Sequence, residues 1–85
     1  REVLIANRRG LHARASAKFV TLAAAQPISV TVAKGGSEIT GTSIMGLMML
    51  GAAKGDTITI SAVGDEAETV VATMCQLVED KFGED

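Results

Sequence analysis

The sequence predicts an α+β fold: a two-layer open-faced sandwich in which three helices cover one face of a four-stranded antiparallel sheet. Two observations predict it. Segments that favour strands and helices follow one another in the order βαββαβα. Three of the four strand segments alternate between an apolar side and a Ser/Thr-rich side, so helices should cover one side and water the other. The length of 85 residues suits one small domain, residues 1–85.

The first strand and the first helix are predicted from a β-forming segment and an alanine-rich segment. Glu2–Ala6 is rich in β-forming side chains and ends at a polar turn that contains glycine. Ala13–Ala25 contains neither Gly nor Pro and is rich in alanine, which predicts a helix that ends at Gln26-Pro27. Helical spacing predicts its buried face: Ser16, Phe19, Val20 and Ala23.

Strict alternation predicts two further strands, and a pair of glycines predicts a hairpin. Ile28–Val32 alternates between apolar and polar side chains, which is typical of a half-buried strand. Gly35-Gly36 then predicts a tight turn, after which Ser37–Thr40 returns as a short strand. Thr57–Ala62 alternates again and is expected to form the fourth strand.

Two more helices complete the predicted fold. Thr42 or Ser43 is expected to cap a short helix over Ile44–Leu50. Gly64 or Asp65 is expected to cap the last helix. Apolar residues at helical spacing predict the buried stripe of that helix: Ala67, Val70, Val71, Met74, Leu77 and Val78.

Composition excludes several classes of function. The net charge of −2 and the absence of Trp and Tyr argue against nucleic acid as a partner. No apolar run is long enough to cross a bilayer, so no membrane association is expected. The only cysteine, Cys75, can form no disulfide within the chain, which fits a reducing cytoplasm. It also lies far in sequence from the only histidine, so neither a metal site nor a cofactor is predicted.

The only histidine, His12, lies in the run Arg8-Arg9-Gly10-Leu11-His12-Ala13-Arg14. Because the predicted helix starts directly after it, its imidazole should lie at a helix N-terminus. Backbone N–H groups and the helix dipole favour bound anions at that position. With guanidinium groups nearby, such a histidine could carry a phosphoryl group. A plain capping or surface histidine is the alternative for these residues alone.

The short helix over residues 44–50 is apolar almost all round. Leu47 and Leu50 can both face the core, since they lie roughly 60° apart on a helical wheel. Some of the remaining side chains should therefore meet solvent as a methionine patch that docks partners: Ile44, Met45, Met48 and Met49. The alternative, for Ile44 or Met48 taken singly, is complete burial.

Two motifs together resemble a known family. Gly10-Leu11-His12-Ala13-Arg14-Ala15, followed by Ser43-Ile44-Met45-Gly46-Leu47-Met48, resembles HPr, the histidine phosphocarrier of the bacterial phosphoenolpyruvate-dependent phosphotransferase system. Gly51-Ala52-Ala53-Lys54-Gly55-Asp56 extends the match. The βαββαβα order is also that of the family, so the resemblance covers essentially the whole chain.

The resemblance implies a role for each matching residue. His12 matches the histidine that takes a phosphoryl group on Nδ1 from phosphorylated Enzyme I and passes it to a IIA protein. Arg14 matches the arginine that pairs with that phosphoryl group. Ser43 matches the serine that HPr kinase/phosphorylase modifies in bacteria that have this enzyme. Ile44, Met45 and Met48 match the hydrophobic docking surface.

The sequence also departs from the family pattern. Ala15 stands where the family usually has proline, and Thr21 and Ala24 stand where some carriers have lysines that help docking. Arg8 and Arg9 could compensate from the preceding loop. The run from residue 43 to residue 50 looks like carriers of alphaproteobacteria and of the nitrogen-related branch, so it does not identify the IIA protein.

Two hypotheses of function follow. In the first, the chain is a monomeric phosphocarrier that acts through His12 and Arg14. It has no Walker lysine motif and no metal-ligand cluster, so the donor enzyme should supply most of the catalysis, and the chain is a carrier rather than a stand-alone enzyme. In the second, it is a regulatory binding module that uses the methionine patch and Ser43. The presence of His12 and Arg14 together favours the first hypothesis.

Overall fold

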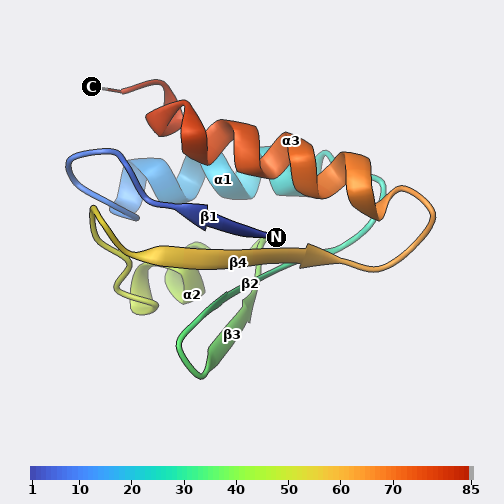
Figure 1. The fold of residues 1–85 in the computed structure, drawn as a ribbon, viewed down its shortest axis with the longest axis horizontal. Helices are drawn as coiled ribbons and strands as arrows, with labels where there is room; N and C mark the ends of the chain where they lie inside the picture. Colours follow the sequence, from blue (N-terminus) through green and yellow to red (C-terminus); the bar gives the residue numbers. More distant parts are fainter. Residues whose placement is uncertain (85) are drawn as a thin grey trace.

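The computed structural model describes residues 1–84 and contains one four-stranded sheet. Its strands are β1 (Glu2–Leu4), β2 (Val30–Lys34), β3 (Ser37–Thr40) and β4 (Thr57–Ala62). They lie in the order β1-β4-β2-β3, and every neighbouring pair is antiparallel (Figure 1). The α+β prediction is therefore confirmed, including the βαββαβα order.

Three α-helices and one short turn complete the fold. These are α1 (Ala13–Ala24), α2 (Ile44–Met49), α3 (Ala67–Glu79) and the turn η1 (Lys81–Gly83). Helices α1 and α3 run alongside each other, and the chain after α3 ends beside the loop that follows β1 (Figure 1). This return brings the end of the described chain to the start of α1. None of the helices within residues 1–84 has the length and apolar character needed to span a bilayer.

The strand register places the apolar side chains of the sheet on one face. Val3 lies opposite Ile58, and Val32 lies opposite Ile60. These four side chains are buried in one core together with Phe19 and Leu47 and with the apolar stripe of α3. The alternate positions of the strands, such as Glu2 and Thr57, are exposed. One covered face and one open face follow directly from the period of two in a strand.

Some predicted boundaries are wrong by a few residues. The second strand begins at Val30 rather than Ile28, because Val30 pairs with Ala62, the last residue of β4. The first strand ends at Leu4, although the backbone of Ile5 still bonds to the loop before β4. The last helix has Glu66 at its N-cap without a side-chain cap bond, so neither Gly64 nor Asp65 caps it.

Most of the predicted buried face of α1 is buried, but only half of the predicted stripe of α3 is, since Ala67, Val71 and Leu77 are half-buried. In α1, Ala15 is buried and Val20 is only half-buried, so the buried face is turned slightly from the prediction. In α3, Cys75 is fully buried beside the predicted stripe. Burial raises the pKa of the Cys75 thiol, which keeps it protonated and unreactive.

Candidate functional site

His12 is the N-cap residue of α1. Its backbone is extended, and its carbonyl accepts the first helical hydrogen bond, from the N–H of Ser16 at 2.9 Å. Its imidazole Nδ1 accepts a hydrogen bond from the backbone N–H of Arg14 at 3.2 Å. Histidine thus does here what Ser or Asp does at most N-caps. The sequence prediction of an imidazole at a helix N-terminus is confirmed.

The other ring nitrogen of His12 contacts a carboxylate from the far end of the chain. His12 Nε2 lies 2.9 Å from Oε1 and 3.0 Å from Oε2 of Glu84. Hydrogen bonds from His12 and Asn7 hold the pKa of Glu84 below its usual value, so the carboxylate is ionised and can only accept. The hydrogen-bond network therefore assigns the ring proton to Nε2 and the lone pair to Nδ1.

Asn7 holds the carboxylate of Glu84 from a second side. It is fully buried, and its Nδ2 donates to Glu84 Oε1 at 2.9 Å and to the carbonyl of Gly10 at 2.8 Å. Sequence reasoning missed both residues. Glu84 lies 72 positions from His12 and carries no motif. Asn7 gave a weak signal only, as a polar residue in the turn before the glycine.

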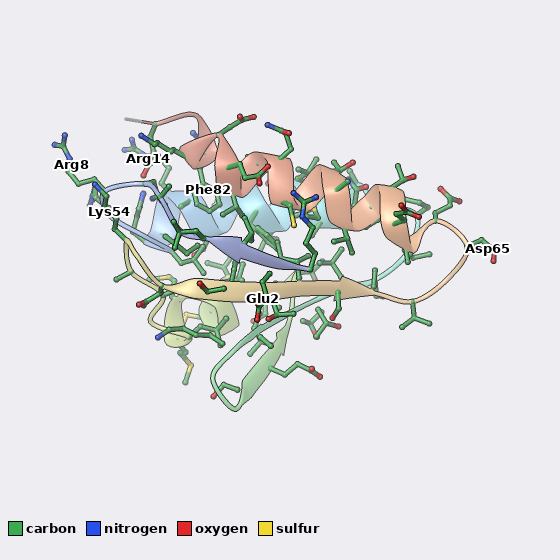
Figure 2. The ribbon with its side chains drawn as sticks, viewed as in Figure 1. Glu2, Arg8, Arg14, Lys54, Asp65 and Phe82 are labelled. Atoms are coloured by element: carbon green, nitrogen blue, oxygen red, sulfur yellow. The ribbon has the colours of Figure 1, made fainter. Side chains whose placement is uncertain are left out.

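Three arginines line a hollow together with Glu84. Arg8, Arg9, Arg14 and Glu84 line a shallow hollow of about 270 Å³. Figure 2 shows Arg8 and Arg14 at one end of the molecule, with Phe82 near them and Asp65 at the opposite end. Within residues 1–84, the structure gives the guanidinium of Arg14 no carboxylate partner. Such a hollow suits a phosphate-like anion, since guanidinium groups bind its oxygens in pairs.

Gly10 fixes the loop that precedes His12. It has φ +64°, and a Cβ at this position would lie 2.4 Å from the carbonyl oxygen of Ala52. The next residue, Leu11, donates its N–H to that same carbonyl at 3.0 Å. The loop before α1 therefore lies directly on the backbone of the loop after α2, which only a residue without a side chain allows.

Gly10→Ala is expected to lower the free energy of unfolding by at least about 1–2 kcal/mol, the strain of a left-handed residue with a side chain. The close backbone contact with Ala52 adds to that strain. Urea denaturation measures the loss. Gly36→Ala is the matched control, because nothing lies within 4 Å of a Cβ there. Equal stability of the two variants would show that the contact between the loops is unimportant.

The methionine patch lies on α2. Met45 and Met49 are 68% and 80% exposed, and Ile44 and Met48 are about two-fifths exposed. Leu47 on the opposite side is fully buried, and Leu50 packs against the core while half-buried. The prediction of an exposed patch is confirmed, and complete burial of Ile44 or Met48 is wrong. Ser43 caps this helix, since its Oγ accepts from the N–H of Gly46 at 2.9 Å.

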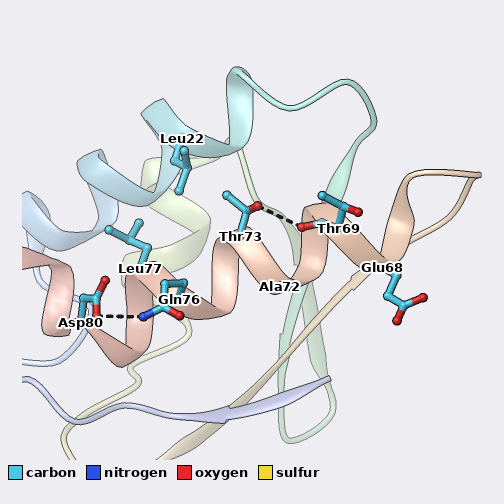
Figure 3. A pocket seen from close by; sticks show the side chains of 8 residues that line it. All are labelled: Leu22, Glu68, Thr69, Ala72, Thr73, Gln76, Leu77 and Asp80. Carbon is cyan, nitrogen blue, oxygen red and sulfur yellow. Dashed lines mark hydrogen bonds between the residues drawn. The ribbon is translucent and has the colours of Figure 1, made fainter.

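Two other features of the described chain were candidates for a functional site: a metal-binding cluster and a groove beside α3. Within residues 1–84, no three His, Cys, Asp or Glu side chains lie close enough together to hold a metal ion. A larger hollow, of about 740 Å³, is an open groove beside α3 with one wall from Leu22 (Figure 3). Its polar groups are used locally, as in the bonds from Thr73 to Thr69 and from Gln76 to Asp80. It contains no histidine or basic side chain.

An open-faced sandwich that presents one histidine at the N-terminus of its first helix, beside a group of arginines, is typical of small phosphoryl carriers. Comparison with known proteins gives the same class. The sequence model of a family described as "PTS HPr component phosphorylation site" matches residues 1–80. The chain therefore belongs to the HPr family of phosphocarriers of the phosphotransferase system.

Relatives from both branches of the family are similar to the chain. The phosphocarrier protein HPr of Neisseria meningitidis is 49% identical over 81 residues, which are 94% of this chain and 90% of the relative. The phosphocarrier protein NPr of Shewanella violacea is 38% identical over 84 residues, which are 99% of this chain and 92% of the relative.

Solved structures confirm the fold. The crystal structure of HPr-C-His from Thermoanaerobacter tengcongensis matches with a TM-score of 0.92 at 38% identity, and the match covers 100% of this chain and 96% of that one. An HPr dimer from the same organism matches with a TM-score of 0.78 at 39% identity and covers 96% of this chain and 94% of that one.

Proposed function

We propose that His12 accepts a phosphoryl group on Nδ1 from phosphorylated Enzyme I and donates it to a IIA protein. The observation that carries the proposal is the position of the imidazole: its Nδ1 lies at the N-terminus of α1, where it accepts a hydrogen bond from the backbone N–H of Arg14. A neutral imidazole nitrogen is nucleophilic near neutral pH, and the bond it forms to phosphorus is readily broken again.

The surroundings of His12 suit storage of the group rather than its hydrolysis. The N–H groups at the start of α1 and the guanidinium of Arg14 can bind the added negative charge. None of these groups is a base that activates water. We expect the donor enzyme to supply most of the catalysis of transfer to a carrier of this kind.

The test is transfer of a labelled phosphoryl group. The chain is mixed with Enzyme I and radiolabelled phosphoenolpyruvate, and the label on the chain is measured before and after acid treatment. We expect one labelled group per chain, lost in acid as a phosphohistidine is, and transferred onward when a IIA protein is added. Absence of label with an Enzyme I that labels a known HPr would contradict the proposal.

Arg14→Ala is expected to slow transfer while it leaves the fold intact. Arg14 is exposed, and its guanidinium lines the arginine hollow. The free energy of unfolding should change by no more than about 0.5 kcal/mol, as at an ordinary surface position. Transfer kinetics and urea denaturation on the same protein check both parts. A large loss of stability with normal transfer would show that the arginine is structural.

A second candidate function rests on the methionine patch. Four exposed apolar side chains on one six-residue helix are unusual for a surface that only meets water. Flexible methionine side chains suit a surface that binds several partners. The chain could thus act as a regulatory binding module through this patch and Ser43. Binding of a partner that persists after His12 is removed would favour it.

Ser43 phosphorylation is expected to inhibit transfer from Enzyme I without unfolding α2. The group would add a charge of about −1.5 to −2 beside the methionine patch, where a partner meets apolar side chains. It would also lie at the N-terminus of α2, where an anion is tolerated. Ser43→Asp should raise the KM for the carrier and leave the circular dichroism spectrum unchanged. Unaltered kinetics in both this variant and the protein phosphorylated by HPr kinase/phosphorylase would leave Ser43 as a cap alone.

Three further parts of the proposal concern the setting of the carrier. We expect it to work in the cytoplasm, where its lone Cys75 stays reduced. We expect it to act as a monomer, although a related HPr forms a dimer, and size-exclusion chromatography with light scattering tests this. Relatives named HPr and NPr both match, so competition between IIA proteins of the sugar and nitrogen-related branches would identify the pathway.

A further inference from the structure

Glu84 reaches His12 on a segment with an uncommon backbone. Lys81, Phe82 and Gly83 have φ values of +58°, +57° and +74°, so three successive residues adopt the left-handed conformation. Residues other than glycine rarely adopt this backbone conformation, and two of these three residues, Lys81 and Phe82, are not glycine. The surrounding structure stabilises the turn. Phe82 is buried in the core, and the ammonium of Lys18 donates to its carbonyl at 2.7 Å.

The left-handed turn directs the carboxylate of Glu84 away from α3 and onto the imidazole. Both carboxylate oxygens lie within 3.0 Å of His12 Nε2, and the side chains of the pair are only 14% and 18% exposed. Strain at a position that the core holds in place is often found where it positions a functional group. The functional group here is the carboxylate.

The side-chain amide of Asn7 is oriented so that its Nδ2 holds the carboxylate of Glu84. Its Nδ2 faces two acceptors, Glu84 and the carbonyl of Gly10, so the reverse orientation would set oxygen against oxygen. As a result its Oδ1 is buried without a hydrogen-bond partner among the described residues. A buried polar atom without a partner is costly. The network therefore satisfies the carboxylate of Glu84 at the expense of the Asn7 oxygen.

We propose that Glu84, held by Asn7 and the left-handed turn, is a positioning residue for phosphoryl transfer, which keeps the proton of His12 on Nε2 and the lone pair on Nδ1. The proposal rests on the proposed function of His12 and deepens it. Without this partner the ring would be held only by the 3.2 Å bond from the Arg14 N–H to Nδ1 among the described residues, so its proton would exchange between the two nitrogens, and the ring would rotate, more readily. Each of these changes removes the lone pair from the face where a donor approaches.

The carboxylate of Glu84 can stay bonded to His12 throughout the transfer step. The N–H of Arg14 releases the Nδ1 lone pair, which forms the bond to phosphorus, and the bond between phosphorus and the donor atom breaks with its electron pair left on the donor. The proton stays on Nε2, so the ring gains one positive charge, which the carboxylate of Glu84 stabilises at 2.9 Å. Donation to the acceptor reverses each change. Glu84 therefore stabilises the charged ring in both directions, as a buried carboxylate does for other catalytic histidines.

Three variants test the proposal. Glu84→Ala removes the acceptor and the charge, and Glu84→Gln removes the charge but retains an acceptor oxygen. Glu79→Ala is the control, because it removes a carboxylate that is 46% exposed and that, among residues 1–84, forms an ion pair with Arg1 and makes no contact with His12. Two experiments are done on each variant: NMR gives the ¹⁵N shifts of the His12 ring, and kinetics gives kcat and KM for transfer from phosphorylated Enzyme I.

In the unaltered chain we expect two well-separated ring nitrogen shifts and an Nε2–H proton protected from exchange. In Glu84→Ala the shifts should move together and the protected proton should disappear. Its kcat should fall roughly ten- to hundredfold, the factor expected for a charge-assisted hydrogen bond, with an unchanged KM. Glu84→Gln should be intermediate in kcat. The Glu79→Ala control should match the unaltered chain.

The outcomes separate this inference from the proposed function. Ring shifts and kcat in Glu84→Ala equal to those of the control would overturn the positioning role, even if the unaltered chain is labelled normally. If the unaltered chain is not labelled at all, the function of His12 fails. The ring shifts then still decide whether Glu84 sets the proton position.

Discussion

Replacing His12 by alanine is expected to abolish labelling of the chain by Enzyme I and phosphoenolpyruvate. His12 is the only histidine in the sequence, so no second imidazole can take its place. The change should leave the fold intact, because it removes one N-cap, a loss of about 0.5–2 kcal/mol. Labelling is measured as acid-labile phosphate on the purified chain. Label that persists in the variant would show that another side chain accepts the group.

A control separates the cap from the chemistry. His12→Asn provides an oxygen that can accept the N–H of Arg14, as asparagine does at many N-caps, but no nucleophilic ring nitrogen. It should be more stable than His12→Ala, because it retains the cap, although both variants lose the bond to Glu84. It should nevertheless be as unreactive as His12→Ala. A labelled His12→Asn protein would contradict the assignment as strongly as labelled His12→Ala.

Leu47→Ala is expected to lower the free energy of unfolding by about 2–5 kcal/mol, the usual range for a leucine removed from a closed core. Leu47 is fully buried on the inner side of α2, where it joins the core beneath the sheet. Urea denaturation measures the loss. Met49→Ala is the matched control on the same helix, because Met49 is 80% exposed and should change stability by no more than about 0.5 kcal/mol.

Met45→Glu is expected to do the opposite: it should weaken binding to Enzyme I and leave stability unchanged. It places a charge on the outer side of α2, in a surface that a partner would desolvate. Val63→Glu adds the same charge at an exposed apolar residue and should bind normally, because Val63 lies two positions before Asp65, which Figure 2 shows at the end of the molecule opposite Arg14. If Met45→Glu unfolded the chain and Leu47→Ala only weakened binding, the two sides of α2 would be assigned wrongly.

The two sides of α2 could be predicted because helical geometry is local. The six apolar side chains within residues 44–50 cannot all face one sheet, so some had to meet solvent. The leucine at 47 and the methionines at 45 and 49 separated as expected. Boundaries were predicted less well. The start of β2 depends on where β4 ends, and that pairing lies outside any short window of sequence.

The sequence by itself determined the order of the elements, the apolar face of the sheet, the position of His12 at a helix start and the exposed methionines. Each of these depends on residues within a few positions of one another, where strand and helix periodicities apply. Only the tertiary structure decided which groups surround the imidazole. Glu84 meets His12 across 72 positions because three left-handed residues turn the chain back after α3, and buried Asn7 fixes the carboxylate there. No local pattern encodes such a contact, since it depends on the burial of Phe82 in the core.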